Sequence, residues 1–338
     1  MEFAGSHILS VGQFERADVE LVFKVADAMQ PYARRRKITR VLEGAILGSM
    51  FFEPSTRTRV SFGSAFNLLG GEVRETTGIE NSAIAKGESL YDTARVLSGY
   101  SDVVAMRHPQ VGSVAEFAAA SRVPVINGGD GSNEHPTQAL LDLYTIRSEL
   151  SAQGRGIDAL RIAMVGDLRF GRTVHSLCKL LCLFDGVSVT LVSPDELRMP
   201  GEIVEALRQA GHKVLEIDAM EEGIARVDIV YSTRLQEERF ASPEEASLYR
   251  GRFRLNQQIY TRHCDPNTVI MHPLPRDSRE AARELDDDLN ENPNLAIFRQ
   301  TDNGVLVRMA LFALILDVVA QVDKQARDVS WYTGGRFA

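Results

Sequence analysis

Residues 45–69 read AILGSMFFEPSTRTRVSFGSAFNLL, and this stretch decides the fold. Residues 45–52 form an apolar run of the length of a buried strand, and residues 61–69 have the character of a helix. Between them lies the polar sequence Glu-Pro-Ser-Thr-Arg-Thr-Arg, residues 53–59. A buried strand that leads through a polar loop into a helix is the building unit of α/β proteins. The stretch therefore predicts an α/β fold.

The same alternation of strand and helix patterns continues along the chain. Further strands are expected at 102–106, 123–127, 161–167, 187–193, 213–217, 228–232 and 268–272. Helices are expected at 15–30, 114–120, 137–146 and 172–184. Strands that alternate with helices favour parallel sheets covered on both faces. In such sheets, binding sites form at the carboxyl ends of the strands.

The length of 338 residues favours two domains. A polar, glycine-rich segment at 148–160 separates a helix from a new strand, so we expect one domain in 1–150 and a second in 151–304. Each is predicted to be a doubly wound, mainly parallel sheet flanked by helices. A final helix near 305–322, within a C-terminal part 305–338, either closes the second domain or returns to pack on the first.

Composition excludes several classes of protein. The net charge of −8 disfavours a general nucleic-acid binder, whose domains usually carry a basic excess. The beginning of the chain lacks the pattern of a signal peptide, and its three cysteines cannot form a disulfide framework, so a cytoplasmic protein is expected. The most apolar stretch, Met309 to Leu316, is far shorter than the ~20 residues of a membrane span.

The loop at 53–59 has the character of a phosphate site. A helix N-terminus offers unpaired backbone N–H groups and a partial positive charge, which suit an anion. Ser55, Thr56 and Thr58 add hydroxyl groups, and Arg57 can bind phosphate oxygens with two N–H groups. The alternative is that Ser55 or Thr56 only caps the helix. Two arginines among three hydroxyls within five residues favour the phosphate site.

At this point the sequence resembles the carbamoyltransferase family, which includes the aspartate and ornithine enzymes. The segment STRTR is similar to the carbamoyl-phosphate signature of that family. Three further segments agree with the family in order along the chain: MRHPQ (106–110), HPTQ (135–138) and HPLP (272–275).

The resemblance implies a role for each residue of these motifs. Ser55, Thr56, Arg57 and Thr58 would hold the phosphate; Thr58, Arg107 and His135 would point at the carbamoyl oxygen; Gln138 would bind the carbamoyl amino group; Leu274 and Pro275 would complete this side of the site. Donors aimed at the carbonyl oxygen stabilise the negative charge that forms there when an amine attacks. We expect His135 to polarise the carbonyl rather than to abstract a proton.

The second substrate is expected to be L-aspartate. Arg172 and Thr173 open the helix after strand 161–167, and Arg234 and Gln236 follow strand 228–232. In the aspartate branch of the family, matching residues bind the two carboxylates, whereas a second arginine would repel the cationic side chain of ornithine. The ornithine branch also usually has a cysteine in the last motif, which here is HPLPR.

The segment NSAIAKGE (81–88) resembles the mobile loop of the family, from which Ser82 and Lys86 would reach into the site of a neighbouring subunit. The resemblance thus implies a homotrimer with shared sites, with a regulatory or other pathway subunit left open. No metal or cofactor is expected, and the departing phosphate is the expected proton acceptor.

Three other hypotheses are weaker. Gly166, Asp167 and Gly171 lack the spacing of a dinucleotide-binding turn. Cys178 and Cys182 have no second pair of metal ligands at matching spacing, so buried thiols are expected. The basic run 34–37 follows Pro31 and fits a solvated loop better than a nucleic-acid site.

Overall fold

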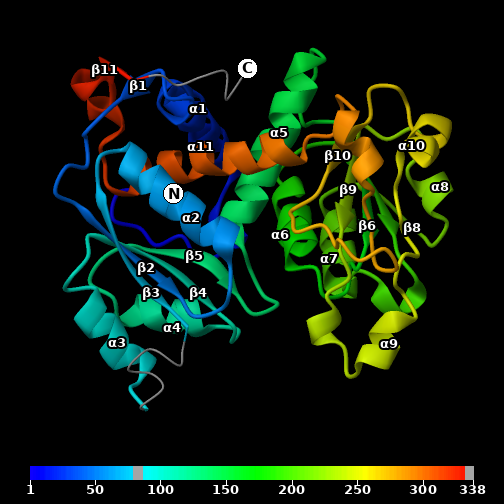
Figure 1. Cartoon of the computed structure of the whole chain (residues 1–338), viewed down its shortest axis with the longest axis horizontal. Coiled ribbons are helices and arrows are strands. Elements are labelled where there is room, and N and C mark those ends of the chain that lie inside the picture. The colour runs from blue at the N-terminus through cyan, green and yellow to red at the C-terminus, as the bar shows by residue number, and fades with distance from the viewer. Residues whose placement is uncertain (79–86, 332–338) are drawn as a thin grey trace. The chain divides into compact units, whose positions relative to one another are not determined.

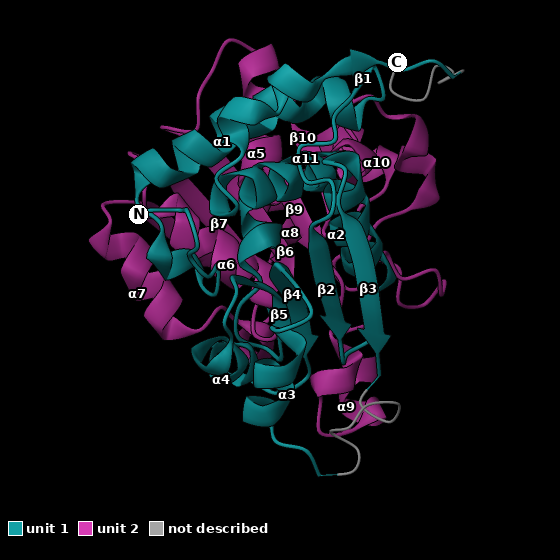
Figure 2. Cartoon of the chain, turned by 90° about the vertical axis from the view of Figure 1, so that its left-hand side faces the viewer, with its two compact units in different colours: residues 1–140, 302–338 teal, residues 141–301 magenta. Residues whose placement is uncertain are grey.

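The computed structural model describes residues 1–78 and 87–331 (Figure 1). The chain divides into two compact units, and the first of them is discontinuous in sequence (Figure 2). The first unit comprises Met1–Leu140 and Asp302–Ala338, and the second comprises Leu141–Thr301. Helix α11 (Ile297–Ile315) passes from the second unit into the first, so the C-terminal part of the chain does return to the first unit.

The sheet of the first unit is parallel throughout. Its strands are β2 (Ile46–Phe51), β3 (Glu72–Thr77), β4 (Val103–His108) and β5 (Val125–Asp130), in the spatial order β3-β2-β4-β5. Three of them were predicted as strands. The edge strand β3 was not, because its sequence EVRETT is polar and mostly exposed and carries no apolar run. A short antiparallel pair, β1 (Lys37–Ile38) with β11 (Arg327–Asp328), completes the described strands of this unit.

Helices cover both faces of this sheet (Figure 1). They are α1 (Arg16–Ala33), α2 (Thr56–Leu68), α3 (Leu90–Leu97), α4 (Ser113–Ala120), the start of α5 (Pro136–Ala152) and most of α11. Phe312 of α11 packs edge-on against Phe66 of α2, with ring centroids 4.9 Å apart. Several helix boundaries differ from prediction. Helix α2 begins at Thr56 rather than 61, because polar residues of its first turn hide the helical pattern. Helix α5 ends at Ala152 rather than 146, helix α6 ends at Leu181 rather than 184, and the last helix spans 297–315 rather than 305–322.

The second unit has a five-stranded parallel sheet. Its strands are β6 (Arg161–Gly166), β7 (Ser188–Val192), β8 (Lys213–Ile217), β9 (Ile229–Thr233) and β10 (Val269–Met271), in the order β10-β9-β6-β7-β8. All five lie where strands were predicted. The helices are α6 (Arg172–Leu181), α7 (Gly201–Gln209), α8 (Met220–Gly223), α9 (Pro243–Ser247) and α10 (Gln257–His263). One core cluster joins β6, β9 and β10 to α8 and α10 through Val165, Val230, Ile270, Ile224 and Tyr260.

Each sheet has one point at which the order of its strands reverses. In the first unit the chain moves from β2 to β3 on one side and from β4 to β5 on the other, so the reversal lies between β2 and β4. In the second unit it lies between β6 and β9. The loops after two such strands leave in opposite directions, which opens a crevice where doubly wound folds bind ligands.

No single helix among the described residues is both long and apolar enough to cross a membrane. Helix α11 and the segment Val319–Gln325 meet these criteria only together, and the chain bends by 106° between them.

Candidate active site

The loop after β2 leads directly into helix α2 at the reversal point of the first sheet. Ser55 is the N-cap residue of α2, and its side chain makes no capping hydrogen bond. The hydroxyl therefore does not cap the helix, and a helix N-terminus is in general well suited to binding an anion. Thr56 and Arg57 are exposed in this turn, whereas Thr58 is buried. The capping alternative considered from the sequence is thus wrong for Ser55.

Arg107 lies beside this loop on the neighbouring strand. The β2–β4 register places Phe51 opposite Arg107, and the N–H of Phe52 donates to the Arg107 carbonyl at 2.9 Å. The guanidinium group is only 12% exposed and lies 2.7 Å from a carboxylate oxygen of Glu53. Its Nη1 also donates to the Gly128 carbonyl at 3.4 Å. Glu53 therefore fixes the orientation of Arg107. It belongs to the loop 53–59, but no role was predicted for it.

His135 is buried at the end of the loop between β5 and α5. Asp130, which is 2% exposed, organises this loop. Its carboxylate accepts four hydrogen bonds at 3.1 Å, from the backbone N–H groups of Gly112 and Glu134 and the side-chain amides of Asn127 and Asn133. Four neutral donors can satisfy a buried carboxylate without a cation. No local sequence pattern indicated this role for Asp130. Gln138, half-buried, lies one turn along α5.

A second buried aspartate organises the reversal point of the other sheet. Gly166 ends β6 at φ +119°, and a Cβ there would lie 2.3 Å from the Thr233 carbonyl, so only glycine fits between β6 and β9. The next residue, Asp167, accepts hydrogen bonds from the N–H groups of Phe170 and Gln236, both at 3.0 Å. Burial raises the pKa of Asp167, although these N–H groups oppose the shift. One carboxylate thus connects the loops that carry the predicted aspartate ligands.

Arg172 and Thr173 form the first turn of α6, and both are half-buried. The Thr173 hydroxyl forms a hydrogen bond with Tyr231, whose own hydroxyl donates to Asp142 at 2.7 Å. Burial, together with Asp142, raises the pKa of Tyr231 well above its usual range. The side chain of Thr173 is therefore hydrogen-bonded to a buried tyrosine of the second unit.

Arg234 follows β9 and has a carboxylate partner of its own. Its Nη1 and Nη2 atoms lie 3.1 and 2.5 Å from the two carboxylate oxygens of Glu238. Further bonds run from Nη1 to the Leu235 carbonyl at 2.9 Å and from Nη2 to the Gln236 side chain at 3.5 Å. Burial acts to raise the pKa of Glu238, but the hydrogen bonds from Arg234 outweigh it, and the pKa is lowered. Sequence reasoning missed Glu238, although oppositely charged residues four positions apart, such as Arg234 and Glu238, often form ion pairs.

Leu274 and Pro275 lie in the loop that follows β10, joined by a cis peptide bond. Leu274 has a φ of +58°, which is rare for a residue other than glycine. Its N–H donates to Nδ1 of His272 at 2.8 Å.

The predicted residues fall into two groups, one in each unit. Ser55 to Thr58, Arg107, His135 and Gln138 lie at the carboxyl edge of the first sheet. Arg172, Thr173, Arg234, Gln236, Leu274 and Pro275 follow β6, β9 and β10 at the same edge of the second. Ser82 and Lys86 lie outside the described residues. Hydroxyls, amides and guanidinium groups dominate both sets, which suits binding of anions and polarisation of a carbonyl group.

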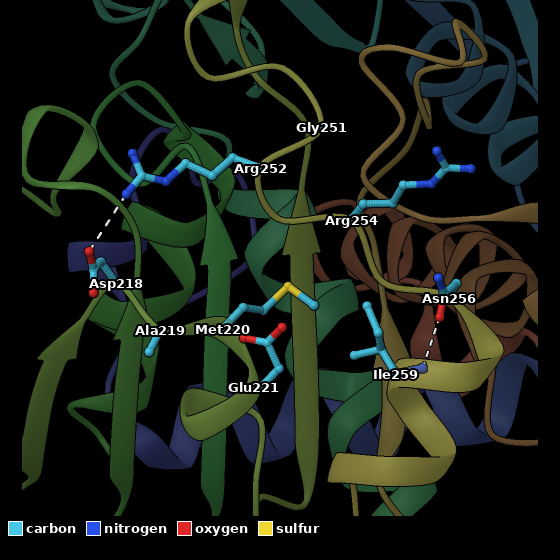
Figure 3. A pocket seen from close by; sticks show the side chains of 9 residues that line it. All are labelled: Asp218, Ala219, Met220, Glu221, Gly251, Arg252, Arg254, Asn256 and Ile259. Carbon is cyan, nitrogen blue, oxygen red and sulfur yellow. Dashed lines mark hydrogen bonds and ion pairs between the residues drawn. The ribbon is translucent and has the colours of Figure 1, made fainter.

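A pocket of about 340 Å³ lies elsewhere in the second unit, at the end of β8, and contains none of these residues (Figure 3). Its arginines already face carboxylates. Arg252 lies 3.6 Å from Asp218, and Arg254 lies 2.7 Å from both Glu280 and Asp286. These carboxylates offset the charge of the two guanidinium groups.

Among residues 1–78 and 87–331, no group of three or more His, Cys, Asp or Glu side chains is placed to hold a metal ion. Cys178 is buried on α6, and burial raises the pKa of its thiol. Cys182 is only half-buried, so the expectation of two buried thiols is right for Cys178 alone.

Comparison with known proteins agrees with the two-unit structure. The family model described as "Aspartate/ornithine carbamoyltransferase, carbamoyl-P binding domain" matches residues 6–148. The model described as "Aspartate/ornithine carbamoyltransferase, Asp/Orn binding domain" matches residues 158–315.

Individual relatives match over almost the whole chain. The aspartate carbamoyltransferase catalytic subunit of Cellvibrio japonicus is 75% identical and covers 99% of both chains. That of Saccharophagus degradans is also 75% identical, over 100% of both. Among solved structures, aspartate transcarbamoylase from Trypanosoma cruzi in complex with carbamoyl phosphate and aspartate has a TM-score of 0.85 at 38% identity, covering 93% of this chain and 98% of that one. The catalytic subunit from M. Jannaschii has a TM-score of 0.83 at 42% identity, covering 92% and 98%.

Proposed function

The chain belongs to the aspartate/ornithine carbamoyltransferase family, and we propose that residues of its two units bind the two substrates of a single reaction. It is an enzyme that transfers the carbamoyl group of carbamoyl phosphate to the amino group of L-aspartate, giving N-carbamoyl-L-aspartate and phosphate, an early step of pyrimidine biosynthesis. The functional domains are 1–150 for carbamoyl phosphate and 151–304 for aspartate, with 305–338 as the returning C-terminal part. The observation that carries the proposal is that the expected ligands follow the strands at the carboxyl edges of the two parallel sheets.

On the carbamoyl-phosphate side, the helix N-terminus and its side chains neutralise the phosphate. Ser55, Thr56, Arg57 and Thr58 bind the phosphate oxygens, and Leu274 and Pro275 contact the same substrate. Thr58, Arg107 and His135 donate to the carbamoyl oxygen, and Gln138 binds the carbamoyl amino group. The close contact of Arg107 with Glu53 supports this assignment, because it holds the guanidinium group in one orientation.

On the aspartate side, cationic and polar groups bind two carboxylates. Arg172 and Thr173 act from the start of α6, and Arg234 and Gln236 act from the loop after β9. Two arginines would repel the ammonium side chain of ornithine, so the acceptor is aspartate.

Transfer requires positioning and charge stabilisation. The neutral amine of aspartate attacks the carbonyl carbon, and the charge on the oxygen is stabilised by the donors aimed at it. The new C–N bond forms as the C–O bond to phosphate breaks. The amine proton passes to the departing phosphate, so no separate base is required.

An assay with two acceptors tests the reaction. The purified chain with carbamoyl phosphate should form N-carbamoyl-L-aspartate with L-aspartate and no citrulline with L-ornithine. Product from ornithine at a comparable rate would contradict the assignment of Arg172 and Arg234.

We propose further that the enzyme is a cytoplasmic homotrimer with sites shared between subunits, and that a regulatory or other pathway subunit can join it. Ser82 and Lys86 would then complete the site of a neighbour. Two inactive variants, Arg57→Ala and Lys86→Ala, should regain part of the activity when dissociated and reassembled together, because some sites in the mixture receive both native residues. Mixtures that stay inactive would exclude shared sites.

A further inference from the structure

The loop after β10 contains a buried histidine that the reaction does not use. His272 begins the loop, and its side chain is fully buried. Its Nδ1 accepts the N–H of Leu274 at 2.8 Å, so a neutral His272 carries its proton on Nε2. Leu274 has a φ of +58°, a conformation that costs a leucine energy unless its surroundings impose it. The contact with His272 is one such constraint.

Glu284 contacts both ends of this loop. Its Oε1 lies 2.8 Å from Nε2 of His272, a close polar contact outside hydrogen-bond geometry, and its side chain is only 8% exposed. The N–H of Asp277 donates to the same carboxylate, at 3.2 Å from Oε1 and 3.3 Å from Oε2. A single carboxylate therefore lies between the first and last residues of the segment that carries Leu274 and Pro275.

The backbone of Glu284 is itself fixed. The N–H of Leu255 donates to the Glu284 carbonyl at 2.9 Å, and the N–H of Asp286 donates to the Leu255 carbonyl at 2.9 Å. Leu285 between them is fully buried in the core of the second unit. Glu284 comes from the acidic segment 277–296, and its side chain turns inward while that of Glu280 is 72% exposed.

We infer that Glu284 is a positioning residue for the carbamoyl-phosphate side of the site, which holds Leu274 and Pro275 through His272 at one end of the loop and Asp277 at the other. The inference rests on the proposed function, in which Leu274 and Pro275 contact carbamoyl phosphate. Site residues need support of this kind, because a displacement of about 1 Å can reduce the rate by about 100-fold.

The charges around Glu284 predict for which substrate binding is weakened when Glu284 is replaced. The negative charges of Glu284 and Asp277 act on Arg234, but the carboxylate hydrogen-bonded to Arg234 is that of Glu238. Asp277 is matched by Arg279 at 2.5 Å. Neutralising Glu284 therefore disturbs the carbamoyl-phosphate loop directly and the aspartate ligand only at a distance.

The test is Glu284→Gln in the full chain. With its oxygen at the position of Oε1, a glutamine places its NH2 group at the position of Oε2, where it faces the N–H of Asp277. This clash of two donors and the loss of the negative charge should hold both ends of the loop less firmly. The KM for carbamoyl phosphate should rise by at least about fivefold, while the KM for aspartate at saturating carbamoyl phosphate changes by less than about threefold. Glu280→Gln is the matched control: it changes the same chemical group in the same segment, which pairs with Arg254 at 2.7 Å, and should leave both constants near wild type.

If Glu284→Gln does not fold, His272→Asn removes the same contact from the other side. Its side-chain oxygen lies near the position of Nδ1 and can still accept from Leu274, so the KM for carbamoyl phosphate should again rise selectively. Equal increases in both KM values with a lowered Tm, or kinetics equal to those of Glu280→Gln, would overturn the inference and leave the proposed function intact. A wild-type chain without carbamoyl transfer would overturn the proposed function and the inference with it.

Discussion

The Oδ2 atom of Asp167 accepts the backbone N–H of Gln236 at 3.0 Å, and its Oδ1 accepts that of Phe170. The loops after β6 and β9 are therefore held at a fixed distance by one side chain. Because Arg172 and Arg234 lie at the ends of these loops, the spacing of the two cations depends on Asp167.

Replacing Asp167 with asparagine should weaken aspartate binding. Asparagine keeps the shape but has a single acceptor oxygen, so one of the two loop contacts is lost. We expect the KM for aspartate to rise by roughly tenfold and the KM for carbamoyl phosphate to stay within about twofold. Steady-state kinetics with each substrate varied in turn measures both values. Asp195→Asn is the control, since that side chain is 75% exposed and pairs with Arg198. A proportional increase in both KM values would argue against a local role.

Arg57→Ala should abolish turnover without unfolding the chain. Arg57 is exposed in the first turn of α2, so its removal leaves no cavity. Loss of a charged ligand to the departing phosphate should lower kcat by at least about 100-fold. The Tm should remain within about 2 °C of wild type, since exposed substitutions usually change stability by at most about 0.5 kcal/mol. Arg40→Ala, at an exposed arginine paired with Glu43, is the control. Near-normal activity of Arg57→Ala would contradict the assignment of Arg57 as a ligand of the phosphate group.

Glu238→Gln tests whether Arg234 is oriented by its partner. The ion pair engages both terminal nitrogens of Arg234, and a neutral glutamine would hold them less firmly. The KM for aspartate should rise by roughly three- to tenfold, because the guanidinium group must then be ordered on binding. Glu20→Gln removes the equivalent partner, four residues from Arg16 and 59% exposed, and should change nothing. A fall in the KM for aspartate would show instead that Glu238 competes with the substrate.

Stability in acid should depend on Asp228. Burial would raise the pKa of this carboxyl, but hydrogen bonds from Arg155 and Arg161 hold it at about 2. Since a free aspartate titrates near pH 3.9, the pair stabilises the folded state above that pH and loses this effect as pH falls toward 2. Asp228→Asn should cost about 2–3 kcal/mol at pH 7 and progressively less between pH 4 and 2.

The measurement for Asp228 is Tm as a function of pH for wild type and variant. The two curves should converge below pH 4. Curves that stay parallel from pH 7 to pH 2 would show that the carboxylate does not titrate in this window.

The sequence predicted those parts of the fold that carry an apolar pattern. Every strand predicted from a hydrophobic run is present, and the parallel order follows from their alternation with helices. The edge strand β3, the helices α3 and α7 to α10, and the first turn of α11 were not predicted. Strand β3 is polar and mostly exposed, and polar residues in the first turn of α11 pair with distant groups. Gln300 of α11, for example, donates to Asp142 and accepts the N–H of His272.

In the site, sequence reasoning found candidates for substrate contact and missed the acidic residues that support them. Glu53, Asp130, Asp167 and Glu238 have their effect through partners distant in sequence or through backbone N–H groups, which no local pattern records. The proposed ligand roles of Ser55 to Thr58, Arg107, His135, Gln138, Arg172, Thr173, Arg234 and Gln236 stay predictions until the kinetics are measured.

The route of α11 has a consequence for synthesis of the chain. The core of the first unit includes Phe312, which packs against Phe62 and Phe66, and Arg308, whose guanidinium carbon lies 4.8 Å from the centre of the Phe62 ring. These residues emerge from the ribosome after the whole second unit. The N-terminal half must therefore wait, with an apolar surface exposed, while the later half can already fold. Translation of the first unit begins before that of the second, but the first unit can complete its fold only after the second unit has been synthesised.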